Sequence, residues 1–355
     1  MKVLVVKTSS LGDVIHTLPA LTDAAAAIPD IRFDWVVEEA YAEIPTWHPA
    51  VDDVIPVAMR HWRKHPFDAW HQGAWAQFKA KLRAARYDAV IDAQGLLKSA
   101  WLTRQARGTR FGFDRHSARE PMAARFYDAP QSVAKGQHAV ERVRQLFAKS
   151  LGYENQTQGR TIKGEYRLTL PTADSSTLGG GARDPNVASP DTVVLLHGTT
   201  WPTKHWPERS WIALSVLLVD AGYRVMLPWG DERERLRAER IARVSGAEVP
   251  DRMRLTDLAG LMANAIGCVS VDTGLGHLAA AVDTPTVSLF GPTNPELTGF
   301  YGRNQVCLHS RFHCAPCLGK KCSYATPESR GAPCFDELSA DRVFADFMRL
   351  VGAYF

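Results

Sequence analysis

Hydrophobic positions fall in short apolar runs, separated by longer stretches rich in Ala and Leu or with helical periodicity. Short apolar runs are typical of buried parallel strands, and the stretches between them are long enough for helices. We expect strands at 3–6, 34–37, 89–91, 192–196, 224–227, 268–271 and 286–290. We expect helices at 14–28, 74–86, 96–107, 137–151 and 208–220. The alternation predicts an α/β protein with parallel sheets covered by helices.

A change in composition divides the chain in two. Residues 173–190 are rich in Gly, Ser, Asp and Pro and lack an apolar period, which is typical of a linker. We therefore predict two Rossmann-like domains, 1–172 and 191–338, with a cleft between them. The terminal helix, at about 339–355, is expected to pack back on the first domain. Ligands of such sheets bind beyond the carboxyl ends of the strands, so residues that follow strands are the first candidates for function.

Composition and charge narrow the possible functions. The 355 residues are 45% hydrophobic and 23% charged, which is ordinary for a globular protein. A net charge of +4 is too small for bulk nucleic-acid binding, so an anionic ligand must be met locally. Without an apolar run of about 20 residues or a signal peptide, the protein is expected to be cytoplasmic. The turn after the first strand is not a phosphate-binding loop of the Walker type, and it lacks two of the three glycines of a dinucleotide fingerprint, which argues against an oxidoreductase.

The first predicted strand is followed by a turn of small residues that ends in an acid. Ser9, Ser10 and Gly12 would present hydroxyl and backbone N–H groups at the end of the sheet, and Asp13 begins the next helix. A carboxylate at that position can act as a base. It can equally be a helix N-cap, which Asp fills well.

Three polar clusters follow strands in the second half. The first contains Thr199, Thr200 and Lys204, which suit a phosphate, although they could also form a turn and a solvated charge. In the second, Glu234 could accept ribose hydroxyls or belong to a solvated helix face. The third cluster begins another helix and contains Asp272, Thr273, Gly274 and His277. All three should lie at one edge of one sheet.

Positive charge gathers locally in the first half. Arg60, Arg63 and Lys64 surround Trp62, and the stretch from Lys98 to Arg125, which includes Arg119, is also basic. These residues fit either a solvated face or a site for a multiply anionic substrate or an anionic membrane.

Five of the six cysteines lie within residues 307–334. Cys314, Cys317, Cys322 and Cys334 are ligand types suited to structural zinc, but their spacing is not that of a standard finger or ribbon. Free thiols are the alternative.

Five segments in order resemble the bacterial lipopolysaccharide heptosyltransferases. They are 6–13 (Val-Lys-Thr-Ser-Ser-Leu-Gly-Asp), 33–39, 87–95, 204–207 (Lys-His-Trp-Pro) and 270–274 (Ser-Val-Asp-Thr-Gly). The chain departs from the family pattern in its Cys-rich stretch, and at His61, where a further arginine is frequent.

The resemblance implies a GT-B fold and an inverting, metal-independent glycosyltransferase without a cofactor. It would move L-glycero-D-manno-heptose from ADP-heptose to the Kdo of Kdo2-lipid A at the cytoplasmic face of the inner membrane. By the same resemblance, Asp13 is the base and Lys204 assists the departing ADP. The implied donor-binding residues are Ser9, Ser10, Gly12, Thr199, Thr200, Lys204, Glu234, Asp272, Thr273, Gly274 and His277. The implied acceptor-binding residues are Arg60, Arg63, Lys64 and Arg119.

Three alternatives stay open at this point. The first is a heptosyltransferase of type II or another nucleotide-sugar transferase of the same fold. The second is a hydrolysing sugar-nucleotide epimerase, and the third is a non-catalytic binder that needs no base at residue 13.

Overall fold

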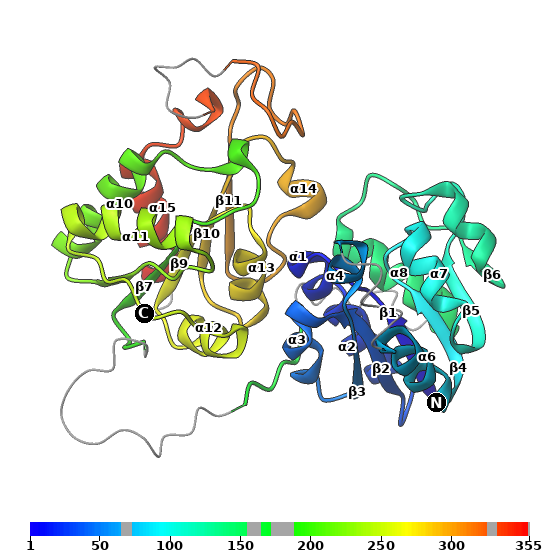
Figure 1. The fold of residues 1–355 in the computed structure, drawn as a ribbon. Helices are drawn as coiled ribbons and strands as arrows, with labels where there is room; N and C mark the ends of the chain where they lie inside the picture. The colour runs from blue at the N-terminus through cyan, green and yellow to red at the C-terminus, as the bar shows by residue number, and fades with distance from the viewer. Residues whose placement is uncertain (65–72, 155–164, 172–187, 325–331, 354–355) are drawn as a thin grey trace, which may run out of the picture. The chain divides into compact units, whose positions relative to one another are not determined.

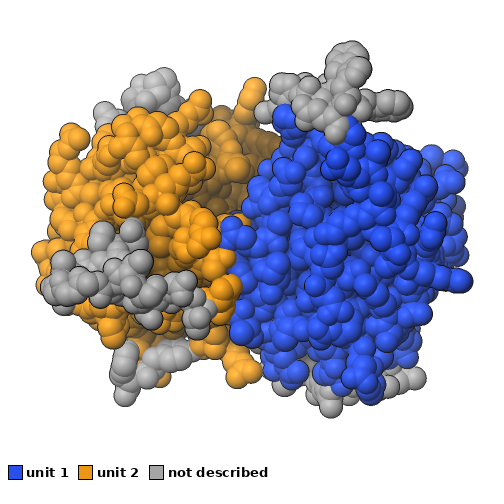
Figure 2. Space-filling view, turned by 60° about the horizontal axis from the view of Figure 1, so that its bottom comes forward, with its two compact units in different colours: residues 1–169 blue, residues 170–355 orange. Residues whose placement is uncertain are grey.

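The computed structural model describes all of the chain except residues 65–72, 155–164, 172–187, 325–331 and 354–355 (Figure 1). It divides into two compact units, residues 1–169 and 170–355 (Figure 2). Most of the predicted linker, 173–190, therefore lies outside the described residues. No helix in the described ranges is long and apolar enough to cross a membrane.

The first unit is built on a six-stranded sheet in the order β3-β2-β1-β4-β5-β6. Every pairing in it is parallel. The strands are β1 (Lys2–Val6), β2 (Arg32–Glu38), β3 (Val51–Val57), β4 (Arg86–Asp92), β5 (Arg107–Phe113) and β6 (Ala129–Gln131). The main helices are α1 (Leu11–Ile15), α2 (Leu18–Ala27), α3 (Glu43–Thr46), α4 (Met59–Lys64), α6 (Ala74–Ala84), α7 (Leu97–Thr103) and α8 (Ala139–Leu151). Short 3-10 turns form η1 (Glu39–Tyr41) and η2 (Pro121–Phe126).

Successive side chains along each central strand point to opposite faces of this sheet. Leu4 and Val6 pack with Leu82 of α6 and Leu102 of α7 in one cluster. Phe33, which pairs with Val3, is directed to the other face, where its ring lies 6.3 Å from that of Phe147 in α8. Helices therefore cover both faces, as the apolar runs predict.

The second unit has a five-stranded parallel sheet in the order β11-β10-β9-β7-β8. The strands are β7 (Thr192–Leu196), β8 (Arg224–Met226), β9 (Gly267–Val271), β10 (Thr286–Phe290) and β11 (Gln305–His309). The helices are α10 (Glu208–Asp220), α11 (Glu232–Ser245), α12 (Leu255–Ala263), α13 (Gly274–Ala281), α14 (Pro295–Thr298) and α15 (Ala340–Gly352). Two 3-10 turns are η4 (Pro202–Lys204) and η5 (Pro333–Phe335).

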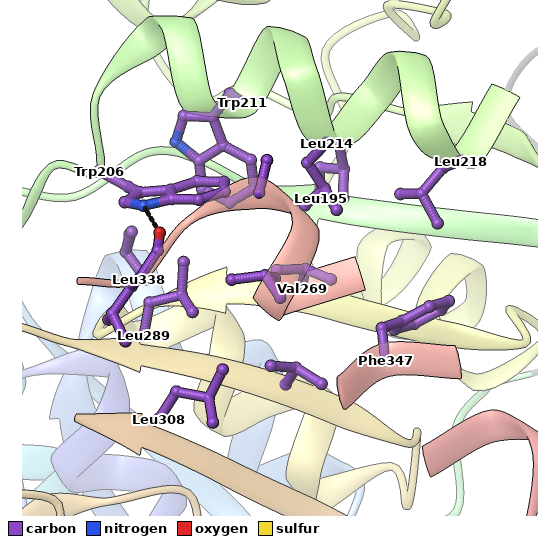
Figure 3. Packing of buried hydrophobic residues seen from close by; sticks show 14 of the residues in the cluster. Leu195, Trp206, Trp211, Leu214, Leu218, Val269, Leu289, Leu308, Leu338 and Phe347 are labelled. Carbon is purple, nitrogen blue, oxygen red and sulfur yellow. Dashed lines mark hydrogen bonds between the residues drawn. The ribbon is translucent and has the colours of Figure 1, made fainter. Parts of the chain in front are cut away.

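One face of this sheet carries a large apolar cluster (Figure 3). Trp206 and Trp211 meet edge to face with ring centroids 5.0 Å apart, and Trp206 Nε1 donates to the Leu338 carbonyl at 2.9 Å. The terminal helix α15 contributes Phe347 to the same cluster. The expectation that this helix packs on the first domain is wrong, because its buried face completes the core of the second unit.

The predicted strands and helices all appear, with two kinds of difference. Strands β3, β5, β6 and β11 were not predicted, because they are edge or near-edge strands with partly exposed, polar or proline-containing sequences. The single helix predicted at 14–28 is two helices, α1 and α2, with a break at His16–Thr17. The helix predicted at 96–107 ends at Thr103, which leaves Arg107 to begin β5.

Helix α13 can begin where it does only because residue 276 has no side chain. A Cβ on Gly276 would lie 1.9 Å from Cζ of the buried Phe300 and 2.6 Å from Ser270 Oγ. We predict that Gly276→Ala destabilises the protein by about 1–3 kcal/mol, the usual cost of overpacking. Gly260, inside α12, is the matched control, because a Cβ there meets nothing within 4 Å. Gly260→Ala should be neutral or stabilising by about 0.5–1 kcal/mol. Denaturant unfolding of both variants tests this, and equal stabilities would contradict the assigned packing.

Candidate functional site

Each sheet has a point where the strand order reverses, and parallel sheets bind ligands outside the carboxyl ends of the strands there. In the first unit the chain leaves β1 toward β2 on one side and later returns as β4 on the other. In the second unit β7 lies between β8 and β9 in the same way. The reversal point of the first unit brings together the turns after β1 and β4. That of the second unit brings together the turns after β7 and β9.

In the first unit, Asp13 lies in the first turn of α1, directly after the turn that follows β1, and is held from two sides. Its Oδ2 accepts hydrogen bonds from the backbone N–H of Ser10 at 2.9 Å and from Ser10 Oγ at 2.8 Å. Its Oδ1 lies 3.8 Å from Lys7 Nζ. Ser10 is therefore the N-cap of α1, and Asp13 is the reciprocal acid of a capping box rather than the N-cap itself.

The turn after β4 fixes this arrangement. Gln94 accepts hydrogen bonds from the N–H and the hydroxyl of Thr8, and donates to the Ser9 carbonyl at 3.0 Å. The fully buried Asp92 in turn accepts the N–H of Gln94 at 2.8 Å. Because these bonds join the two turns, the position of Asp13 depends on both strands.

Asp13 lines a cavity of about 360 Å³ that is otherwise cationic. The lining includes Lys7, Arg119, Lys135 and Arg142, together with His16 and Ser9. Arg142 is oriented by its hydrogen bond to the Ser117 carbonyl at 2.6 Å and by the ring of Phe113, 4.9 Å from its guanidinium carbon. One carboxylate among four cations suits an anionic ligand that also carries a group for the carboxylate to act on.

The charges in this cavity shift each other's titration. Burial tends to raise the pKa of Asp13, but Lys7, the hydrogen bonds from Ser10 and nearby His16 outweigh it and hold the pKa below its ordinary value. Burial lowers the pKa of Lys7, with Arg119 and Arg142 acting in the same direction and Asp13 opposing them. Asp13 is consequently a carboxylate at neutral pH.

The other predicted acceptor residues are placed differently. Arg60 is in α4, where its N–H donates to Glu38 at 2.8 Å and its guanidinium carbon lies 5.4 Å from the ring centroid of Tyr41. It is not among the residues that line the Asp13 cavity. The side chains of Arg63 and Lys64 lie outside the described part of the structure.

In the second unit, Lys204 and Asp272 form the centre of the polar edge. Lys204 Nζ lies 2.7 Å from Asp272 Oδ2, which also accepts the hydroxyl of Thr293 at 2.6 Å. Thr199 Oγ1 donates to the Asp272 carbonyl at 3.2 Å, and His277 Nε2 lies 4.0 Å from Asp272 Oδ1. The structure thus joins the first and third predicted clusters around one buried carboxylate.

Glu234 lies at the same edge, beside the end of β7. Its Oε2 accepts the N–H of Gly230 at 2.8 Å, and Asp231 caps the helix that carries it. A Cβ on Gly198 would lie 2.2 Å from Glu234 Oε1, so a glycine after β7 is what lets this carboxylate approach the turn. Thr200 is exposed, and Thr273 caps α13.

Comparison with known proteins identifies the family. Residues 75–326 match the model of glycosyltransferase family 9 (heptosyltransferase). The chain is 55% identical over 354 residues to lipopolysaccharide heptosyltransferase 1 of Pseudomonas aeruginosa, with 97% of this chain and 96% of that protein covered. The chain belongs to glycosyltransferase family 9.

Further comparisons agree with this family 9 assignment. Lipopolysaccharide heptosyltransferase 1 of Escherichia coli K12 is 52% identical over 315 residues, which cover 88% of this chain and 94% of the relative. The solved structure of E. coli heptosyltransferase WaaC with ADP superimposes with a TM-score of 0.83 at 45% identity, covering 99% of this chain and all of that one. E. coli ADP-heptose lps heptosyltransferase II shares the fold at 19% identity, with a TM-score of 0.74. The expected GT-B fold is confirmed.

Several residues of these two sites were not predicted from the sequence. Lys7 and Thr293 could have been found, since each follows a strand directly or within three residues. Arg142 and Phe300 could not, because they come from a helix and a loop remote in sequence. Phe300 forms one wall beside His277, with ring centroids 4.8 Å apart.

Arg237 orients the segment that carries Lys204. It contacts His205 Nδ1 and donates to the Trp206 carbonyl at 2.6 Å. Burial, with Arg237 adding to it, lowers the pKa of His205 to about 4, so this histidine is neutral at physiological pH. The contacts from Arg237 therefore position the segment, and the neutral His205 adds no charge next to Lys204.

The four cysteines of the predicted zinc site line one small cavity of about 20 Å³. Burial, with the other three thiols adding to it, raises the pKa of Cys334 to about 12. Among the described residues, no group of three or more His, Cys, Asp or Glu side chains is arranged to hold a metal ion. The zinc site therefore stays a prediction, with free thiols as its alternative.

Metal analysis distinguishes a zinc site from free thiols. If the cysteines bind zinc, the purified protein should contain about one zinc per chain, and a chelator should lower its Tm because structural metal binding is folding free energy. Cys317→Ser should lose the metal, whereas Cys268→Ser, in β9, should keep it. A metal-free protein with unchanged Tm would assign free thiols to this cavity.

Proposed function

We propose that this protein is a lipopolysaccharide heptosyltransferase I. It transfers L-glycero-D-manno-heptose from ADP-heptose to the Kdo of Kdo2-lipid A, with inversion at the anomeric carbon and without a catalytic metal. The observation that carries the proposal is the Asp13 cavity, where one ionised carboxylate lies among Lys7, Arg119, Lys135 and Arg142. The relatives that are 55% and 52% identical are both named lipopolysaccharide heptosyltransferase 1, which supports the same acceptor step.

The first unit binds the acceptor in this proposal. Kdo carries a carboxylate, and lipid A carries phosphates, so the cationic lining attracts and orients them. Asp13 then takes the proton of the attacking hydroxyl. The low pKa of Asp13 makes it a weak base, but the hydroxyl becomes much more acidic as its oxygen bonds to the anomeric carbon. Proton transfer late in that step therefore suits a carboxylate held in the ionised form.

The second unit binds the donor. The ammonium group of Lys204 and the hydroxyls of Thr199 and Thr200 meet the diphosphate, while Glu234 accepts ribose hydroxyls. Lys204 stabilises the charge that accumulates on the departing ADP, as fixed cations do at leaving groups. Asp272, Thr273, Gly274 and His277 form the rest of this site. Ser9, Ser10 and Gly12 are further donor-binding residues in this proposal.

The acceptor is a membrane lipid, so we also propose that the protein works at the cytoplasmic face of the inner membrane as a peripheral protein. The cationic lining of the Asp13 cavity would meet the carboxylate and phosphates of such a lipid.

Release of ADP tests the activity directly. The protein is incubated with ADP-heptose, with and without Kdo2-lipid A, and ADP is measured. Acceptor-dependent release supports the proposal. Release without acceptor would indicate an epimerase or hydrolase, and no release would indicate a binder. If an acceptor that already carries the first heptose is used instead, and is preferred, the enzyme is of type II.

Asp13→Asn should remove the base and spare the fold, because Asn can still accept the N–H of Ser10. We expect kcat to fall by about 10²–10⁴-fold, with donor affinity and Tm little changed. Asp23→Asn is the control, since Asp23 pairs with Arg144 outside the cavity and should keep normal kcat. Loss of Tm with normal turnover per folded molecule would make Asp13 only a capping residue.

Lys204→Ala should change the kinetics in a different way from Asp13→Asn. We expect kcat to fall about 10²–10³-fold, the scale of losing one electrostatic donor, together with weaker ADP binding, because the diphosphate is charged in the ground state as well. Lys320→Ala is the control, because Lys320 also lies over the ring of Trp201 but forms no ion pair with Asp272. Kinetics and ADP titration compare them. Equal effects of the two variants would mean that general positive charge, not the position of Lys204, matters.

A further inference from the structure

Exposed apolar side chains gather on two adjacent elements of the first unit. Among its described residues, the large hydrophobic side chains that are exposed are Met1, Leu97, Trp101 and Met122. Leu97 and Trp101, each 42% exposed, are four residues apart in α7 and so share one face of the helix. Met122, 48% exposed, lies in η2. Three of the four exposed apolar side chains therefore belong to α7 and η2, which we call the α7–η2 face.

The α7–η2 face is a rigid surface. The two elements pack through Ala100, Ala123 and Tyr127, with Phe126 against them. Trp101 stacks on Trp75, with ring centroids 4.7 Å apart and planes 16° apart. Stacking on Trp75 therefore fixes the orientation of the Trp101 ring. The aromatic cluster continues from Trp75 into the core.

Exposed cations lie on and next to the same two elements, and the guanidinium carbon of Arg104 is 5.8 Å from the ring centroid of Phe126 in η2. Lys98, Arg104, Arg119 and Arg125 are all exposed. From Lys98 to Arg125 the chain has seven Lys and Arg residues, and the acids are Asp114 and Glu120. Both acids already accept backbone hydrogen bonds, Glu120 from the N–H of Leu97 at 2.6 Å. The face therefore combines a few protruding apolar groups, Trp101 among them, with these exposed cations, which we call its positive rim.

The α7–η2 face also adjoins the Asp13 cavity. Arg119 lines that cavity and immediately precedes Glu120, whose N–H donates to the Gly95 carbonyl at 3.0 Å. Gly95 in turn follows Gln94, another lining residue. A headgroup in the cavity would therefore place attached acyl chains beside Leu97, Trp101 and Met122. This last step depends on the proposed lipid acceptor, whereas the chemistry of the face does not.

We propose that the α7–η2 face docks on an anionic lipid bilayer. Three protruding apolar side chains are too few for the core of a stable protein interface, which buries about 800 Å² on each partner. They suit shallow insertion between headgroups, where Trp is favoured and Lys and Arg meet lipid phosphates. The positive rim makes the attraction specific for anionic lipid and sensitive to salt.

Vesicle sedimentation of the full chain tests the proposal without any acceptor lipid. The probes are vesicles of phosphatidylcholine alone and of phosphatidylcholine with about a third phosphatidylglycerol. The wild type should bind the anionic vesicles, and the binding should weaken as salt rises from about 0.05 M to about 0.5 M. Absence of binding to anionic vesicles, or equal binding to both kinds, would overturn the proposal.

Two double variants assign the binding to this face. Leu97→Gln with Met122→Gln removes apolar contacts, and Arg104→Gln with Arg125→Gln removes charge, so each should weaken binding about tenfold or more. The matched controls are Leu236→Gln with Val244→Gln, and Arg233→Gln with Arg243→Gln. These residues are exposed in α11 of the second unit, so the changes should leave binding unaltered. Undiminished binding by both α7–η2 variants would place the docking surface elsewhere and overturn the proposal.

Three further measurements separate the remaining outcomes. Tm in solution shows whether each variant is folded, and the arginine pair, which is not in the core, keeps the test valid if the apolar pair destabilises. Turnover of a water-soluble Kdo acceptor without acyl chains should be unchanged in both variants, so loss of docking is distinguishable from failure of the proposed activity. A dimer in solution that dissociates in the Leu97→Gln/Met122→Gln variant would instead make a second copy the occupant, and would overturn the lipid proposal.

Discussion

Every strand pair described within either sheet is parallel, so each strand must be joined to the next by a crossover that passes over one face of the sheet. Successive crossovers add strands on one side of the first strand until the strand order reverses, and later strands are added on its other side. At that point the turns after two neighbouring strands lead away in opposite directions. The turns after β1 and β4, and those after β7 and β9, are such pairs. Lys204 lies in one of these turns and Asp13 begins the helix after another, so the positions of the two central groups follow from strand order before any side-chain contact is considered.

The two polar sites use opposite electrostatic arrangements. In the first unit a single carboxylate is surrounded by cations, and Lys7 keeps Asp13 ionised although burial acts against this. In the second unit Lys204 faces the buried carboxylate of Asp272. Neither arrangement is a simple patch of one charge. In each, the functional group is held in position by a partner of opposite sign from the same or a neighbouring turn.

The strands that lie in the middle of each sheet could be predicted from sequence, because burial on both faces makes them continuous apolar runs. The edge strands β3 and β6 could not, since proline and partial exposure remove that pattern. Most of the site residues that follow central strands, such as Thr199 and Asp272, were predicted because the strands before them were, although Lys7 and Thr293 were missed. Arg142 and Phe300 were missed, because only tertiary packing brings a residue of α8 beside Asp13, or a residue of the loop after α14 beside His277. The packing of α15 also depends on tertiary structure: its amphipathic pattern shows that one face is buried but not which unit buries it.

The ion pair between Lys204 and Asp272 has a consequence for which anions can occupy the second unit. Both side chains are largely withdrawn from water, with 16% and 7% of their surfaces exposed, so the pairing is screened much less than one at the surface. An incoming anion must compete with the Asp272 carboxylate for the ammonium group of Lys204. It is strongly attracted only if it carries more negative charge than that carboxylate. Singly charged solutes such as chloride or acetate meet a site that is close to neutral, whereas a diphosphate offers more charge than Asp272 does. The resting enzyme thus resists occupation by the abundant small anions of its surroundings, which a bare lysine would collect.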